Sequence, residues 1–387
     1  MHASAAPTTS FTLVDLARDL RSRLKADREA AITRFQHDRS VARLLPALRR
    51  HVDQAVVAAA QALSLPRSCA LIAVGGFGRG ELFPYSDVDL LILLSEPLDD
   101  ATSQRVADFV SVCWDIGLEV GHSVRTVAEC LQEAERDITV QTSVLECRYL
   151  SGSHAAYSQL KRGLNEAMDP KRFFQAKMLE MRQRHARFQD TPYSLEPNCK
   201  ESPGGLRDLQ VILWVARAAG LGTSWRALRQ HGLITSEEES ALIRNERVLK
   251  TIRAQLHILS KRREDRLVFD VQTALAEALG FKPAGTRRVS EVLMQRYYWA
   301  AKAVVQLNRI LLQNIEQRIF EREDAPAQQI DAHFNNVNDL LDIARDDVFE
   351  REPATMLEAF RVMQQHPELK GMSTRTLRAL WHARNRI

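Results

Sequence analysis

The sequence predicts an α+β protein in which a small mixed β-sheet follows N-terminal helices and precedes a large all-α helical domain. Glycine (16) and proline (13) are sparse among the 387 residues, and long stretches rich in Ala, Leu, Arg and Glu are typical of helices. Two short apolar runs, at residues 71–74 and 88–94, instead have the length and the branched side chains of buried strands. The apolar residues outside these runs recur at helical spacing, so we expect most of the chain to be helical.

A chain of this length can build more than one hydrophobic core. We expect N-terminal helices in residues 1–64, a sheet-containing core in 65–152, a helical domain that supports the substrate or nucleotide in 153–322, and a C-terminal helical segment in 323–387. The interval 321–329, which contains Ala-Pro-Ala, is the best candidate for a linker.

Composition restricts the class of protein. The formal net charge of +4 is small for this length and does not indicate a nucleic-acid partner. Five widely spaced cysteines without a C-x-x-C pair indicate neither a disulfide framework nor a zinc site, and favour a reducing compartment. No stretch has the length and apolar character of a membrane span. We therefore expect a soluble cytoplasmic protein; composition says nothing of its oligomeric state.

The first predicted helix begins at Thr12, because Asp15 follows three residues later as in a capped helix start. Apolar residues then recur at helical spacing as far as Leu63. This pattern predicts two helices before the first strand.

The stretch from Leu71 to Leu94 is the most informative part of the chain. It reads LIAVGGFGRGELFPYSDVDLLILL: a strand, the glycine pair Gly75-Gly76, a short turn and a second strand with two aspartates. Asp87 and Asp89 alternate with apolar residues, so the period of a strand places both carboxylates on one face. Two adjacent carboxylates repel each other and resist ionisation, a conflict that a divalent cation resolves. The pattern therefore indicates a magnesium site beside a glycine-rich phosphate-binding turn.

Other glycine-rich motifs fit this stretch poorly. Gly75 and Gly80 have the spacing of a Walker loop, but Glu81 and Leu82 follow where that loop needs lysine and a hydroxyl. A dinucleotide fingerprint needs G-x-G-x-x-G and an acidic residue about twenty positions later, whereas the acids here lie on the next strand. The remaining alternative is a glycine turn between two core strands whose aspartates are merely exposed.

At these residues the sequence resembles the nucleotidyltransferase superfamily that includes DNA polymerase beta, and its form GGFGRGELFPYSDVDLLIL is similar to the PII-protein uridylyltransferases of bacteria. Residues 196–210 (EPNCKESPGGLRDLQ) and 118–126 (LEVGHSVRT) resemble further signatures of that family. The resemblance extends from about Asp15 to the C-terminus.

The resemblance implies transfer of UMP from UTP to a tyrosine hydroxyl of the PII signal protein, with Mg²⁺ as cofactor; Mn²⁺ uses similar ligands. The catalytic and metal-binding residues would be Asp87, Asp89 and a third carboxylate, for which Glu119 is the candidate. Asp115 and Asp137 are alternatives, and Glu119 can also be read as an exposed strand residue. Backbone N–H groups of Gly75 and Gly76 would receive the triphosphate. Ser86 and Arg79 would support it, although Arg79 can equally tie the turn to Glu81 or to the sheet.

The elements after the aspartates are also predicted from local patterns. Residues 103–114 have the pattern of a helix, and residues 118–120 alternate as a third strand would. Thr126 and Glu129 form a capping-box signature, and a further helix is expected over 137–150. Beyond Gly152 the chain should be almost entirely helical. The helices expected there cover 171–188, one that opens at Leu206, 237–261, 289–319 and a last set from 338 onwards.

A second candidate anion site lies where a helix opens at Leu206. Gly204 and Gly205 precede it, so free N–H groups at the helix start, with Lys200 and Arg207 beside them, would bind phosphate or nucleotide. The alternative is an ordinary helix start that Asp208 stabilises. The basic run 261–263, next to two acids, is interpreted as a solvated helix end.

Three hypotheses remain open. The chain can be a PII uridylyltransferase catalytic region, a nucleotidyltransferase with another acceptor (glutamine synthetase, a small molecule or an RNA end), or a non-catalytic module that binds nucleotide or PII. In the family that the chain resembles, uridylyl removal belongs to a downstream HD domain. The sequence has no such His…His-Asp…Asp set, so we expect an excised catalytic region without removal activity.

Overall fold

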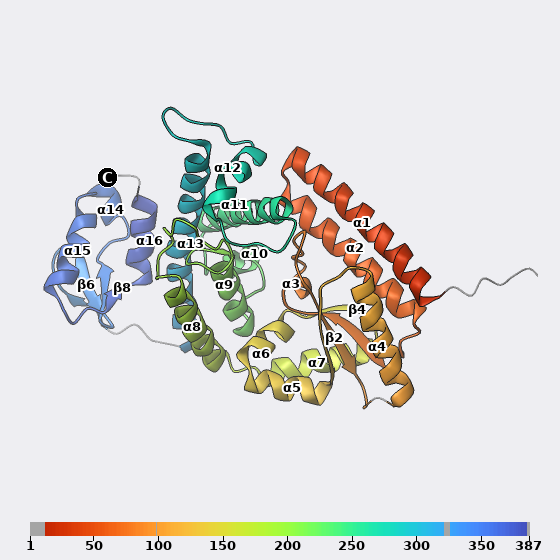
Figure 1. Ribbon diagram of the computed structural model, residues 1–387. Coiled ribbons are helices and arrows are strands. Elements are labelled where there is room, and N and C mark those ends of the chain that lie inside the picture. The colour runs from red at the N-terminus through yellow and green to blue at the C-terminus, as the bar shows by residue number, and fades with distance from the viewer. Residues whose placement is uncertain (1–11, 98, 321–325, 385–387) are drawn as a thin grey trace, which may run out of the picture. The chain divides into compact units, whose positions relative to one another are not determined.

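The computed structural model describes all residues except 1–11, 98, 321–325 and 385–387 (Figure 1). The chain forms two compact units. The first unit consists of Met1–Asp169, Tyr193–Lys200 and Arg247–Tyr297, and the second of Pro170–Pro192, Glu201–Glu246 and Tyr298–Ile387. The first unit thus includes three stretches that were predicted as part of the helical domain, namely residues 153–169, 193–200 and 247–297.

Two long helices, α1 (Leu13–Asp38) and α2 (Val41–Ala62), precede the sheet as predicted. The capping box at the start of α1 is confirmed: the Thr12 hydroxyl accepts from the Asp15 N–H, and the Asp15 carboxylate accepts from the Thr12 N–H. Leucines at helical spacing bury one side of each helix, which is why the pattern was readable in the sequence.

The first sheet is mixed, as predicted, and has the strand order β3-β2-β1-β4. Strands β1 (Cys69–Ala73) and β2 (Val88–Leu94) are antiparallel, and β3 (Val120–Thr126) runs parallel to β2. Along the chain, the one-turn helix α3 (Gly75–Gly78) follows β1 and precedes β2. Every residue of β1 is buried, so this strand is the centre of the core of the first unit.

Helices surround this sheet in the first unit (Figure 1). They are α4 (Asp100–Asp115), α5 (Val127–Arg136), α6 (Ile138–Leu145) and α7 (His154–Ala167). The predicted capping box of Thr126 and Glu129 starts α5 and is confirmed.

Two predictions in this unit are corrected. The helix expected over 137–150 ends at Leu145, and a fourth strand, β4 (Arg148–Gly152), follows it. This strand pairs with the edge of β1 that β2 leaves free, and such pairing leaves no local sequence signal. The third strand begins at Val120, so Glu119 directly precedes it.

The helices beyond Gly152 largely match the predicted pattern. The second unit contains α8 (Pro170–Arg187), α9 (Leu206–Ala218) and α10 (Trp225–Gln230), and the first contains α12 (Phe269–Ala278). The long helices α11 (Ser236–Ser260) and α13 (Val289–Phe320) contribute residues to both units. None of the helices that the structure describes combines the length and apolar character needed to cross a membrane.

The prediction of a wholly helical C-terminal segment is wrong. A second sheet forms in the order β5-β6-β7-β8, from Gln328–Gln329, Phe334–Val337, Leu340–Ile343 and Gly371–Met372. The helices α14 (Val348–Arg351), α15 (Thr355–Gln365) and α16 (Thr374–Ala383) belong to the same segment.

A hairpin explains the error. Asn338 and Asp339 both have positive φ, +55° and +61°, and connect β6 to β7 as a two-residue turn. Asn and Asp tolerate this conformation, so the dipeptide was a readable turn signal between two short apolar runs. In the predicted linker, residues 321–325 lie outside the described part of the chain, and Gln328–Gln329 form β5.

Candidate functional site

The glycine turn after β1 is built by close backbone contacts. The Val74 N–H donates to the Asp89 carbonyl at 3.0 Å, and Gly75 adopts a left-handed φ of +56° that glycine accepts without strain. A Cβ on Gly78 would lie 2.5 Å from the Glu146 carbonyl oxygen and 2.8 Å from that of Ala73. No side chain fits there, so the turn can be this tight only with glycine at position 78.

Two glycines make room for the Asp89 carboxylate. A Cβ on Gly75 would lie 3.1 Å from one carboxylate oxygen, and a Cβ on Gly121 would lie 2.6 Å from the other. Gly121 is the β3 residue in register with Asp89. Gly75 was predicted as a site residue, but Gly121 was not, because parallel register cannot be read from either strand alone.

Asp87 and Asp89 act as a pair, as their spacing predicted. Asp87 directly precedes β2 and is exposed, whereas Asp89 lies within the strand and is partly buried. Burial of Asp89 and the negative charge of Asp87 raise the pKa of Asp89 to about 6, while Lys200 and Arg263 act in the opposite direction. The negative charge of Asp87 therefore acts directly on Asp89, although the two carboxylates differ in exposure.

A cavity of about 320 Å³ opens at Asp89. Its lining includes Gly121, His122 and Arg125 from β3 and Ser143 from α6. This volume lies at the lower end of the range of small-ligand sites. Asp89 thus lies next to open space rather than in a closed core, and Asp87 is exposed at the surface.

Arg79 ties the glycine turn to its surroundings. Its guanidinium donates to Glu81 at 2.8 Å and to Glu146 at 2.5 Å, and Lys250 forms a further ion pair with Glu81. Burial alone would raise the pKa of Glu81, but the charges of Arg79 and Lys250 lower it to about 2. The structural role considered for Arg79 matches these contacts, and a nucleotide contact by this residue stays a prediction.

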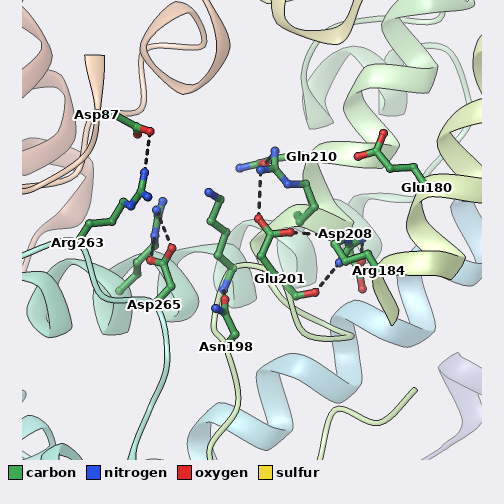
Figure 2. A network of polar contacts seen from close by, with 12 residues as sticks. Asp87, Glu180, Arg184, Asn198, Glu201, Asp208, Gln210, Arg263 and Asp265 are labelled. Carbon is green, nitrogen blue, oxygen red and sulfur yellow. Dashed lines mark hydrogen bonds and ion pairs between the residues drawn. The ribbon is translucent and has the colours of Figure 1, made fainter. Parts of the chain in front are cut away.

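Positive charge reaches the acids from segments far away in the sequence. Arg263 donates to the Asp87 carboxylate at 2.7 Å (Figure 2). Lys200, a predicted nucleotide-binding residue, lies close enough to lower the pKa of Asp89. Residues 261–263 are exposed directly after α11, as the interpretation of a solvated helix end predicts, but Arg263 also pairs with Asp87. No local signal could have found this contact, because 176 residues separate its two partners.

At the predicted anion site before α9, the Asp208 carboxylate takes up one N–H group of the glycine pair. The Asp208 carboxylate accepts from Arg184 at 2.6 Å (Figure 2). The same carboxylate accepts from the Gly204 N–H at 2.7 Å and contacts His185 at 2.8 Å. These contacts match the alternative in which Asp208 stabilises the helix start, and phosphate or nucleotide contact at this place stays a prediction.

The other predicted residues around α9 have their own contacts. The Gly205 N–H donates to the Ser202 carbonyl at 2.8 Å, and Arg207 donates to Glu201 and Gln210. Gly204, Gly205 and Arg207 belong to the second unit, whereas Lys200 belongs to the first.

The remaining predicted residues lie around the acid pair. Glu119 is exposed, and its carbonyl accepts from the Val88 N–H at 2.9 Å, which places its backbone beside Asp87. Ser86 directly precedes Asp87, and Gly76 belongs to α3. Within the described residues, no group of three or more His, Cys, Asp or Glu side chains is arranged to hold a metal ion. A third carboxylate ligand therefore stays a prediction.

Models of known families match three parts of the chain. A nucleotidyltransferase domain matches residues 60–143, which include the glycine turn and both aspartates. The GlnD PII-uridylyltransferase model matches residues 172–312, and the model of the uridylyltransferase GlnD third domain matches residues 334–387.

Curated relatives are similar over almost the whole chain, and those cited here carry the name bifunctional uridylyltransferase/uridylyl-removing enzyme. The relative from Bordetella parapertussis is 56% identical over 374 residues, which are 97% of this chain and 43% of the relative. That from Cupriavidus pinatubonensis is 53% identical over 95% of this chain and 42% of its own length. That from Ralstonia nicotianae is 51% identical over 100% of this chain and 44% of its own length.

The chain therefore spans less than half the length of these relatives. The family models match both the region of the acid pair and the helical region after it. By its sequence and by the strand–turn–strand that carries Asp87 and Asp89, the chain belongs to the PII-uridylyltransferase family.

Proposed function

We propose that this chain transfers UMP from UTP to a tyrosine hydroxyl of the PII signal protein and releases pyrophosphate. The observation that carries the proposal is the acid pair, Asp87 and Asp89, at a glycine turn, with Asp89 lining a cavity of about 320 Å³. The similarity to PII-uridylyltransferases supports the choice of UTP and PII. All five cysteines are buried free thiols, which is compatible with a reducing cytoplasm.

Mg²⁺ fits the donors of this site. It prefers carboxylate oxygens together with substrate phosphates and retained waters, so two protein carboxylates are enough to hold it. Gly75 and Gly121 leave open the space that a side chain would take beside the Asp89 carboxylate. Asp87 and Asp89 would hold the ion, and Glu119 would complete the site. Mn²⁺ would bind the same donors.

When bound, Mg²⁺ makes the acceptor hydroxyl more acidic and neutralises charge on the leaving pyrophosphate. The chain itself positions the reactants. Gly75 and Gly76 offer backbone N–H groups to the triphosphate at the start of α3, and Ser86 flanks the acid pair. Lys200 adds positive charge next to Asp89. The cavity beside β3 gives the nucleotide a place to enter.

A labelling experiment tests the proposal. The protein is incubated with Mg²⁺, purified PII and one labelled nucleotide at a time (UTP, ATP, CTP or GTP). Label on PII from UTP alone is the expected result, and a PII variant with phenylalanine at the acceptor tyrosine should stay unlabelled. Label on glutamine synthetase, a small molecule or an RNA end would show that the acceptor is that molecule and not PII. Nucleotide binding without any transfer would support the hypothesis that the chain is a non-catalytic binding module.

The proposal concerns transfer alone. The relatives' printed name also includes uridylyl removal, but those relatives are more than twice as long as this chain. If this chain released UMP from labelled PII, the proposal that it carries out transfer alone would be wrong.

A further inference from the structure

Arg263 reaches the acid pair from a loop that is firmly anchored. The loop follows α11, and its Asp265 carboxylate accepts from Arg253 at 2.6 Å and contacts the buried His257 at 3.2 Å. The Asp265 carbonyl accepts from the Cys199 N–H at 2.8 Å, so the loop is also joined to the segment that carries Lys200. These contacts hold the backbone close to Arg263 in place, so the loop is a fixed part of the fold.

The contact between Arg263 and Asp87 is nevertheless easy to exchange. Both side chains are about half exposed, at 52% and 48%. Exposed ion pairs contribute little net stability, because water competes for both charges. A stronger partner for either group would separate them at little cost.

The guanidinium contacts one oxygen of a carboxylate that is proposed to hold the metal ion. A divalent cation bound by Asp87 needs a carboxylate oxygen, and Arg263 now donates to one of the two, Oδ2, at 2.7 Å. Metal ion and Arg263 therefore compete for Asp87. A displaced guanidinium needs a new anion, and a nucleoside triphosphate bound through the same metal ion brings several phosphate charges to this place. Arginine is well suited to them, because its planar fork donates two parallel hydrogen bonds to phosphate.

We propose that Arg263 exchanges Asp87 for the phosphates of the nucleotide when the metal–nucleotide complex binds. It then has two roles: it disfavours binding of metal ion without nucleotide, and it stabilises the triphosphate once the metal ion has taken Asp87. Arg263 would thus couple the two binding events. This inference rests on the proposed function and assigns a further nucleotide-binding residue to the same site.

Two binding measurements test the exchange without requiring turnover. Binding of Mn²⁺ alone is followed by electron paramagnetic resonance, and binding of UTP in the presence of Mg²⁺ by calorimetry. For Arg263→Gln we expect Mn²⁺ alone to bind about two- to fivefold more tightly, the range that an exposed ion pair contributes. We expect UTP to bind at least about tenfold more weakly, because a charged hydrogen bond to phosphate is lost.

The neighbouring arginine is a matched control. Arg262→Gln removes the same charge from the same loop, but Arg262 pairs with Glu264 and is 73% exposed. It should change neither measurement by more than about twofold. Arg263→Lys keeps the charge and loses the fork, so it should leave Mn²⁺ binding near that of the parent protein and weaken UTP binding less than glutamine does.

The binding measurements on these variants either support or overturn the exchange. Opposite shifts for Mn²⁺ and UTP in Arg263→Gln, absent in Arg262→Gln, support the exchange. Equal behaviour of the two variants, or weaker binding of both ligands in Arg263→Gln, overturns it while leaving the proposed function intact. Failure of the parent protein to bind either Mn²⁺ or UTP overturns the proposed function as well.

Discussion

Single residues set the charge of the site. Asp89 is partly buried between two glycines, and Asp87 is exposed and paired with Arg263. The two acids therefore differ in environment although they belong to one D-x-D motif. Burial and the charge of Asp87 disfavour ionisation of Asp89, and a bound cation would offset this effect.

Replacing either aspartate by asparagine should abolish transfer without unfolding the protein. Asp87→Asn and Asp89→Asn each remove a negative charge that the metal ion needs, so we expect transfer to fall by more than about 100-fold. The melting temperature should be nearly unchanged, because asparagine has almost the same volume and relieves the repulsion between the acids. Labelled UTP and a thermal melt measure both effects. Normal turnover in either variant would refute the metal assignment.

The same assays examine the third carboxylate. If Glu119 completes the site, Glu119→Gln lowers transfer strongly, whereas Asp115→Asn and Asp137→Asn do not. A loss of transfer confined to either aspartate variant would move the third ligand to that residue.

The raised pKa of Asp89 predicts a pH dependence of metal binding. Its folded-state pKa of about 6 lies above the ordinary value of 3.8, so the proton stabilises the metal-free fold at low pH. That stabilisation is complete below pH 3.8 and is lost as pH rises towards 6. Metal binding must displace the proton, so Mn²⁺ affinity should fall steeply as pH drops from 7 to 5. Asp89→Asn should bind Mn²⁺ weakly with little change over this range; an equally steep fall in that variant would implicate another group.

At the scale of elements, the turn between β1 and β2 positions the acids. Its backbone passes so close to Ala73 and Glu146 that position 78 has no space for a side chain. Position 76 of the same short helix differs, because a Cβ there would find its nearest neighbour at 3.7 Å.

This contrast predicts different effects of one substitution at two glycines. Gly78→Ala should lower the free energy of unfolding by about 1–3 kcal/mol or more, because two carbonyl groups must move. Gly76→Ala should cost less than about 1 kcal/mol, since glycine to alanine in a helix is not unfavourable by itself. Denaturant titration compares the two variants. Equal losses of stability would show that the backbone near position 78 can move and make room for the added Cβ at little cost.

Arg79 anchors the turn to the end of α6. Arg79→Gln leaves the carboxylates of Glu81 and Glu146 without their main partner, although both are largely buried. Breaking such a pair costs about 3–5 kcal/mol. We therefore expect a much lower melting temperature and reduced transfer. A residue that only contacts nucleotide would instead raise the KM for UTP at an unchanged melting temperature, so the two measurements separate the roles.

At the scale of the whole molecule, each unit has its own internal network of charges. The first unit joins the sheet to residues 193–200 and 247–297 through contacts such as those of Asp265 and Arg263. In the second unit, Asp208 is buried against Arg184, His185 and the Gly204 N–H. These networks join segments that lie far apart in the sequence.

Asp208 should matter for the stability of the second unit. Burial would raise its pKa, but His185 and Arg184 lower it below the ordinary value of 3.8. A lowered folded-state pKa gives stability that is present above pH 3.8 and is lost as pH falls through the folded value. Asp208→Asn should therefore cost about 3–5 kcal/mol at neutral pH. The exposed Glu166→Gln in α7 is the control, and equal melting of the two variants would contradict a supporting role for the network.

Features carried by a few neighbouring residues were predictable. They include the capping boxes of Thr12 and Thr126, the glycine turn after β1, and the placement of Asp87 and Asp89 together. The start of α9 after Gly205 was also predictable, but the ion pair of Asp208 with Arg184 was not, because the two residues belong to different helices.

The sequence by itself determined the α+β class, the strand–turn–strand and the acid pair, because periodicity, glycine and helix caps act over a few residues. The tertiary structure alone decided which distant groups meet there. Gly121 stands in register with Asp89, Arg263 contacts Asp87 across 176 residues, and β4 completes the first sheet. Contacts between residues far apart in the sequence depend on strand pairing and on packing between segments, and the local sequence pattern carries little information about either.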